Sequence, residues 1–461
     1  MGIMIGLNLL IKPIWILTEN VVQDELGHET FGLFSALLSL VIVLSVFSDL
    51  GINHYVTNTV AKDKSKYQET LSTFFSARLI ILLLFPLLCI GVGILVGYEG
   101  EHLMYLFTIA VTQALFQFVM LFRAKFQAFQ DFITDSIASV LDRIIILFLV
   151  AMLFVWQLFT LENFVYARFI AIAITALLTF AILIYKYGKF KFSFSFSKIK
   201  EVIVKTLPFT MMTFLYAINE RIDMFMVERL HSSTEAGLYA GAYRWYDAFM
   251  MFIWLIMPMF FAKFSSNENE HKSLLKSGKI LVAVPIIFLG IVLLARNEFM
   301  FFLFQNSTVH QISQMSAILS VLMISYVING VFVLYGTYLN AAGFVSKVNW
   351  LVAISVAINI ALNWYFIPAY GAIASAYTTA FSTLILSVGY FVMIRKKIQT
   401  DSTLLMRLIV LCVVFLLVVF VLHSTFDFTW SVYITFSLLA FLILLFLLKL
   451  HRPFLEALKQ R

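Results

Sequence analysis

The chain has 461 residues, of which 62% are hydrophobic and only 12% are charged. Soluble domains carry roughly 25% charged residues, so this composition excludes a soluble enzyme and predicts an all-α polytopic membrane protein. The net charge of +7 would suit a nucleic-acid partner, but the position of the basic residues beside predicted membrane spans explains it without one.

A membrane-spanning helix needs about 20 apolar residues, and about fourteen such stretches follow one another along the chain. They cover residues 1–18, 31–51, 74–97, 103–122, 137–157, 163–185, 206–227, 237–262, 279–295, 316–339, 348–367, 371–394, 404–422 and 429–448. The connections between them are short, which leaves no room for a separate soluble domain. Cys89 and Cys412 are the only cysteines and lie in apolar stretches, so we expect no disulfides and no bound metal. We also expect no cofactor.

The connections differ in charge on the two sides of the predicted membrane. Lysine and arginine accumulate in short cytoplasmic loops. When the N-terminus is placed inside, the outer connections contain only Arg229 and Arg296, whereas most of the 32 basic residues fall on the inner side. This asymmetry predicts a multi-pass protein with both termini in the cytoplasm.

A weak internal repeat relates the two halves of the chain. Gly27–Ala36 enters the second stretch and Ser233–Gly241 enters the eighth, with Gly32 matching Gly237. Six helices per repeat is an even number, so the two repeats are parallel copies. We therefore expect two six-helix lobes that face each other over a central cleft. The predicted parts are an N-lobe at 1–188, a connector at 189–205, a C-lobe at 206–396, and two further helices with a tail at 397–461.

Several ionisable residues lie inside the apolar stretches. Each costs about 2.5 to 3.5 kcal/mol at the centre of a membrane helix, so they are expected to face one another or water. They are Lys12, Arg78, Asp142, Arg143 and Arg168 in the first lobe, Glu220, Arg221, Asp223, Arg244 and Asp247 in the second, and Asp49 near the inner end of the second stretch. The first lobe has an excess of positive charge, so a cleft lined by these residues would suit an anionic group such as a pyrophosphate.

Pairing within the protein is the alternative to ligand binding for these residues. Arg244 and Asp247 are spaced i,i+3 and share a helix face, as do Glu220 and Asp223. Arg168 can also extend toward the outer membrane surface.

Two other groups are weighed in the same way. Lys12 and Arg78 have no acidic residue three or four positions away, which favours a functional role for them. Asn359 and Asn363 share a face at i,i+4, a spacing typical of amides that hold membrane helices together, and they are also candidates for cleft or gate residues.

Three short motifs resemble a known superfamily. The run Asn359–Ala376, which contains Pro368 and Gly371, resembles the hallmark of helices eleven and twelve in the multidrug/oligosaccharidyl-lipid/polysaccharide exporters. Ser48–Ile52, and Glu235–Tyr239 together with Arg244, resemble further motifs of its polysaccharide-exporter branch.

The resemblance implies a flippase of the bacterial cytoplasmic membrane. Such a protein moves an undecaprenyl-pyrophosphate-linked oligosaccharide to the outer leaflet by alternating access. Its expected partners are this substrate, membrane lipid and other polysaccharide-assembly proteins. The residues that resemblance and position make candidates for pyrophosphate binding are Lys12, Arg78, Arg221 and Arg244.

Three acidic residues and two rival functions complete the predictions. Glu220, Asp223 and Asp247 are candidates for charge pairing or for coupling to a proton or sodium gradient. One rival is a multidrug exporter of the same fold, which would prefer unpaired acids for cationic drugs. The other is a membrane polysaccharide polymerase or glycosyltransferase, which would need an active site in a large loop or a group of carboxylates near the surface.

Overall fold

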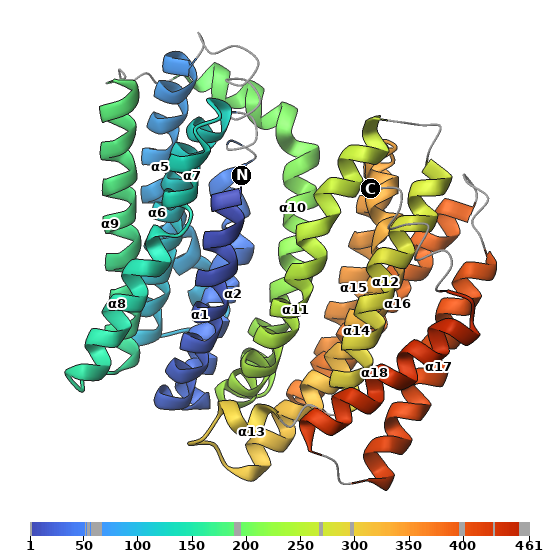
Figure 1. The fold of residues 1–461 in the computed structure, drawn as a ribbon. Coiled ribbons are helices and arrows are strands. Elements are labelled where there is room, and N and C mark those ends of the chain that lie inside the picture. The colour runs from blue at the N-terminus through green and yellow to red at the C-terminus, as the bar shows by residue number, and fades with distance from the viewer. Residues whose placement is uncertain are drawn as a thin grey trace. The chain divides into compact units, whose positions relative to one another are not determined.

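The computed structural model describes residues 2–50, 52, 56, 67–188, 195–266, 271–295, 299–395, 402–426 and 429–450, without the side chains of some helical residues. Within these ranges every regular element is a helix (Figure 1). Twelve helical segments there are long and apolar enough to cross a membrane. The predicted all-α, multi-pass membrane protein is thereby confirmed.

The chain divides into two compact units, residues 1–237 and 238–461. The first holds α1 (Gly2–Leu26), α2 (His28–Leu44), α3 (Val46–Asp49), α5 (Tyr67–Leu95), α6 (Glu101–Ala128), α7 (Phe132–Ala138), α8 (Leu141–Val155), α9 (Leu161–Tyr187) and α10 (Phe196–Leu230). The second holds α12 (His271–Ala295), α13 (Phe299–Leu303), α14 (Val309–Ala341), α15 (Val345–Tyr370), α16 (Ala372–Arg395), α17 (Ser402–Thr425) and α18 (Trp430–Leu447). Helix α11 (Ser233–Ser266) begins in the first unit and continues in the second. The lobe boundaries at 188 and 206 stay a prediction.

Each predicted apolar stretch is largely helical where the structure describes it, although 31–51 is divided between α2 and α3 and 137–157 between α7 and α8, and many of the helices are longer than predicted. The stretch 206–227 lies within α10, which begins at Phe196 and ends at Leu230, and α12 begins at His271 where the prediction began at 279. Hydropathy marks only the part of a helix that suits hydrocarbon. The backbone stays helical past that point because a helix satisfies its own hydrogen bonds at the membrane surface. Lys272 and Lys276, predicted in a connection, therefore lie in α12.

Aromatic side chains pack the interior of the first unit. Helix α6 packs between α5 and α9, and α2 packs along α10. Phe75 lies with its ring centroid 5.4 Å from that of Phe118 and 5.7 Å from that of Phe180, so three helices meet at these rings. Ring pairs of this kind add about 0.5 to 1.5 kcal/mol to the burial of their surface.

Helix α14 forms the centre of the second unit, with α12 and α16 packed against it and α15 against α16. Helices α17 and α18, red in Figure 1, pack on α12 at the edge of this unit. Their cluster of Phe415, Tyr433 and Phe441 is buried against α12. Leucine and phenylalanine side chains exposed elsewhere on α17 and α18 suit contact with lipid.

Candidate functional site

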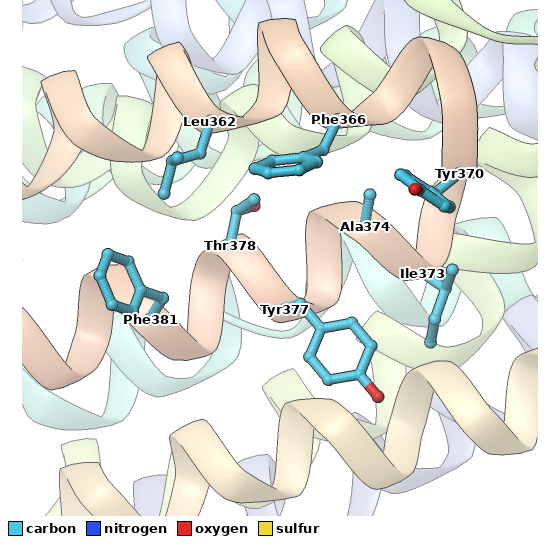
Figure 2. A pocket seen from close by; sticks show the side chains of 8 residues that line it. All are labelled: Leu362, Phe366, Tyr370, Ile373, Ala374, Tyr377, Thr378 and Phe381. Carbon is cyan, nitrogen blue, oxygen red and sulfur yellow. The ribbon is translucent and has the colours of Figure 1, made fainter.

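An open, apolar pocket of about 530 Å³ lies between α15 and α16 (Figure 2). Its lining consists of Leu362, Phe366, Tyr370, Ile373, Ala374, Tyr377, Thr378 and Phe381. The pocket accommodates a hydrocarbon chain by size and polarity. Because a membrane-spanning surface meets lipid chains in any case, the pocket alone indicates no particular ligand.

Behind this pocket, polar side chains join α15 to α16. The Asn363 amide donates to the Asn359 side-chain carbonyl at 3.1 Å, and the Thr378 hydroxyl lies within hydrogen-bonding reach of Asn363. Both asparagines are buried, with exposed fractions of 4% and 0%. In the same interface, the Ser355 hydroxyl of α15 donates to the Ser382 carbonyl of α16 at 2.8 Å. This arrangement matches the packing role that the i,i+4 spacing indicated.

Arg78 and Asp49, two predicted site residues, lie together in the first unit. Arg78 is 1% exposed and donates to the Asp49 carboxylate at 2.5 Å and to the Ser48 carbonyl. The following residue, Leu50, has a left-handed backbone (φ 48°) and ends α3. Arg78 therefore fastens α5 to the C-terminal end of α3, with its acidic partner supplied by another helix.

Arg168 lies inside a second cluster of charged residues. Its guanidinium is 3.5 Å from the Glu19 carboxylate of α1 and also interacts electrostatically with Asp142 and Arg143 of α8. The rings of Trp15, Phe34 and Phe164 lie 5.3 to 5.8 Å from its central carbon. The structure thus brings three predicted residues together with Glu19, which the predicted helix end at residue 18 had excluded.

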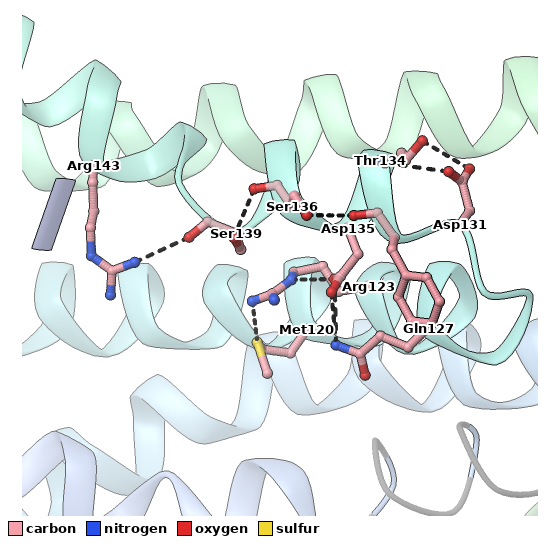
Figure 3. Close-up of polar contacts among 10 residues, drawn as sticks. Met120, Arg123, Gln127, Asp131, Thr134, Asp135, Ser136, Ser139 and Arg143 are labelled. Carbon is pink, nitrogen blue, oxygen red and sulfur yellow. Dashed lines mark hydrogen bonds and ion pairs between the residues drawn. The ribbon is translucent and has the colours of Figure 1, made fainter. Parts of the chain in front are cut away.

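The predicted helix 137–157 is broken beside this cluster. Helix α7 ends at Ala138 and α8 begins at Leu141, with Ser136 in the last turn of α7 and Ser139 in the break (Figure 3). The Ser139 hydroxyl donates to the Ser136 carbonyl, and Arg143 donates to the Ser139 carbonyl at 3.1 Å. Serine hydroxyls that bond back to the preceding turn commonly bend helices, which explains the interruption.

A polar network joins α6, α7 and α9 near the helix ends for which the predicted topology gives a cytoplasmic position. Arg123 donates to the Asp135 carboxylate at 2.8 Å, as Figure 3 shows. Lys186 and Tyr187 donate to Asp131 at 2.9 and 3.0 Å. Burial alone would raise the pKa of Asp131, but hydrogen bonds from Lys186 and Thr134 outweigh it and hold this pKa at about 2.

We expect Asp131→Asn to lower the unfolding temperature of the detergent-solubilised protein. Because the pKa of Asp131 falls from 3.8 to about 2 on folding, the stabilisation is present above pH 3.8 and is lost as the pH falls to about 2. The difference between variant and unaltered protein should therefore persist at neutral pH and vanish near pH 2. Glu99→Gln, at an exposed position, is the control and should show no such difference.

The remaining predicted charges lie on three helices. Glu220, Arg221 and Asp223 are on α10, with Asp223 2% exposed, and Arg244 and Asp247 are half-buried on α11. Each of these five makes a polar, ring or electrostatic contact. The side chain of Lys12 lies outside the described residues, although its backbone belongs to α1.

Sequence reasoning missed a buried carboxylate at the α10–α11 turn. Glu228 accepts hydrogen bonds from Tyr98 at 2.7 Å and from Arg229 at 2.5 Å, and its side chain is 2% exposed. It was assigned to a polar connection, because a charge beside an apolar stretch carries no signal of burial. Tyr98 follows α5, far away in the sequence, so spacing could not have revealed the contact.

Comparisons with known proteins place this arrangement in context. The model of a family described as polysaccharide biosynthesis protein matches residues 1–261. No curated protein sequence matches the chain.

Several solved structures share the fold. A structure entitled lipid II flippase MurJ, inward closed conformation, superposes with a TM-score of 0.77 at 15% identity, over 96% of this chain and 98% of that one. A multidrug resistance MATE family transporter of the MOP superfamily, in its inward-facing conformation, gives 0.69 at 15% identity, over 86% and 97%. A MOP superfamily transporter from Pyrococcus furiosus gives 0.56 at 16% identity, over 86% and 93%. At these identities the likeness establishes the fold alone.

Proposed function

Because the chain belongs to the family of polysaccharide biosynthesis proteins, we propose that it is a flippase for a lipid-linked oligosaccharide. The cargo is an undecaprenyl-pyrophosphate that carries a repeat unit of O-antigen, capsule or exopolysaccharide. The protein moves it from the inner to the outer leaflet of the bacterial cytoplasmic membrane by alternating access. The family match carries this proposal, and the fold shared with a lipid II flippase supports it.

The physical task of such a protein is to move a polar head group. Sugar hydroxyls and a pyrophosphate cost several kcal/mol for each polar group left without partners in hydrocarbon, whereas the prenyl tail has no such cost. Lys12, Arg78, Arg221 and Arg244 are the proposed pyrophosphate ligands. Arg78 is already bound to Asp49, so it would reach a phosphate only by exchanging that carboxylate for it.

Coupling to a proton or sodium gradient is a further part of the proposal. Glu220, Asp223 and Asp247 are the acids that would bind the ion or neutralise the basic residues in turn. A cargo or ion drives the conformational change only through different affinities for the inward-open and outward-open states. In this scheme both termini are cytoplasmic, and the released cargo passes to other polysaccharide-assembly proteins.

Multidrug export is the second candidate, because a MATE family transporter shares the fold over 86% of this chain. The two candidates differ in the charge of their cargo. An exporter of cationic drugs requires unpaired acids in its binding site, whereas a pyrophosphate requires bases.

Deleting the gene separates the two candidates. We expect lipid-linked oligosaccharide to accumulate in the cytoplasmic leaflet, because its polar head group does not cross hydrocarbon unaided. The leaflet distribution is measured by the accessibility of the sugar to a membrane-impermeant glycosidase in spheroplasts and in inverted vesicles. The unaltered gene on a plasmid should restore the distribution. An unchanged distribution with increased sensitivity to cationic dyes would instead support drug export.

A further inference from the structure

The helix ends on either side of the α10–α11 turn contact two other connections of the first unit or the helix ends beside them. The end of α10 contacts the connection from α5 to α6, which contains Val96 and Tyr98, and the first turn of α11 contacts the end of α1 and the start of α2. The predicted topology places all three turns on the outer side of the membrane. They connect helices that are far apart in the sequence, so their contacts determine whether the outer ends of these helices stay together.

The first contact is centred on the buried Glu228 carboxylate. The Tyr98 hydroxyl donates to it at 2.7 Å, and Arg229 donates to both of its oxygens at 2.5 Å. The guanidinium of Arg229 also lies 4.0 Å from the centre of the Tyr98 ring. Burial and then the nearby Glu228 charge raise the pKa of Tyr98, so its hydroxyl stays protonated and donates. A charged acceptor makes these hydrogen bonds about twice as strong as neutral ones.

The second contact is an approach of two helix backbones with no side chains between them. A Cβ atom at Gly32 of α2 would lie 1.8 Å from the Ser233 carbonyl oxygen, and one at Gly237 of α11 would lie 1.9 Å from the His28 carbonyl oxygen. Both clashes are with backbone, so no side chain can move aside to relieve them. Only glycine at both positions permits this crossing of α2 and α11.

A buried side chain of α1 contacts both helices at this crossing. Gln23 at the end of α1 is 0% exposed and donates to the Gly237 carbonyl at 2.7 Å. Its amide nitrogen also lies 3.0 Å from the Nδ1 atom of His28. The first turn of α11 is therefore held both by close backbone packing and by a hydrogen bond from α1.

We propose that Tyr98, Glu228 and Arg229, together with the Gly32–Gly237 crossing, form a latch that closes the outer side of the protein and must separate when that side opens. This inference rests on the proposed transport function, because only a transporter needs the outer side to open. The composition of the contact suits a reversible closure. Polar groups can exchange their partners for water when the contact separates. Separation at the two glycines exposes no large apolar side chains to water.

Labelling of a single cysteine tests the latch without any cargo. The reporter is Ser35→Cys, which is buried on α2 one turn from Gly32, in a chain with Cys89 and Cys412 replaced by serine. Proteoliposomes or spheroplasts are treated from outside with a membrane-impermeant maleimide. We expect Tyr98→Phe and Gly32→Val each to increase the labelling rate by about tenfold, which corresponds to about 1.4 kcal/mol.

Matched substitutions control for general loosening of the helices. Gly91→Val is the same change at a helical glycine with open space around it, and Tyr185→Phe removes a hydroxyl from a side chain that is 91% exposed. Both should label at the rate of the reporter alone. Tyr98→Phe loses a single oxygen, so it decides the question if Gly32→Val fails to fold.

The result that overturns the latch is distinct from one that overturns the transport function. Unchanged labelling in Tyr98→Phe, or labelling only from the cytoplasmic side, would refute the latch. Suppose that Tyr98→Phe labels faster but that deleting the gene leaves the leaflet distribution of lipid-linked oligosaccharide unchanged. This combination would support the latch and refute the proposed cargo.

Discussion

Replacing Arg78 by methionine is expected to lower the free energy of unfolding by about 3 kcal/mol, the lower end of the range for breaking a buried ion pair. The substitution leaves the Asp49 carboxylate without its guanidinium and the Ser48 carbonyl without this donor. Asp49 is 29% exposed, so the protein does not fully enclose the remaining charge, which limits the loss. Reversible unfolding of the purified protein in mixed lipid–detergent micelles measures the difference.

A double substitution separates the ion pair from other effects of Arg78. Adding Asp49→Asn to Arg78→Met removes the uncompensated charge and should recover part of the lost stability, because the two side chains are in direct contact. If Arg78→Met unfolds like the unaltered protein yet no longer transports cargo, Arg78 serves the head group alone and the contact with Asp49 contributes nothing to folding.

The second large effect is expected at Arg168. Arg168→Met removes the partner of Glu19 together with the contact to three aromatic rings. An ion pair between partly exposed side chains, here at 25% and 20%, contributes up to about 1 kcal/mol, and a guanidinium against aromatic rings adds about 0.5 to 2 kcal/mol. We therefore expect a loss of about 2 kcal/mol in the same unfolding measurement.

Arg168→Lys is the informative companion because it keeps the charge. An ammonium group cannot present the flat face that a guanidinium places against aromatic rings, so the stability of this variant should lie between those of Arg168→Met and the unaltered protein. A lysine variant as stable as the unaltered protein would show that charge alone matters, and that Trp15, Phe34 and Phe164 only fill space around it.

The apolar stretches of the sequence were enough to predict the helices, because hydrocarbon imposes a minimum apolar length on every span. Hydropathy could not place the helix ends, since α10 and α12 continue through charged turns. Nor could it reveal the break between α7 and α8. The signal for that break was present in Ser136 and Ser139, whose hydroxyls bond to the preceding turn.

The pairing of charges was less accessible than the helices. The rule for neighbours three or four residues apart finds partners on the same helix, and by that rule Arg78 had none. Its partner Asp49 lies on another helix 29 residues away, a contact that depends on packing. The match of Gly32 with Gly237 was visible as repetition in the sequence. That these two glycines also lie at one helix crossing needed coordinates.

The network around Asp131 has a consequence for biogenesis. Lys186 and Arg123 belong to the positive charges that would orient the nascent chain in the membrane, yet in the folded protein they are bound to Asp131 and Asp135. Neutralising Lys186 or Arg123 would therefore disturb both the insertion of the chain by the translocon and the ion pairs of the folded protein. Lys347, which lies over the ring of Phe344, is therefore the better position for manipulating orientation during synthesis while leaving those two ion pairs intact.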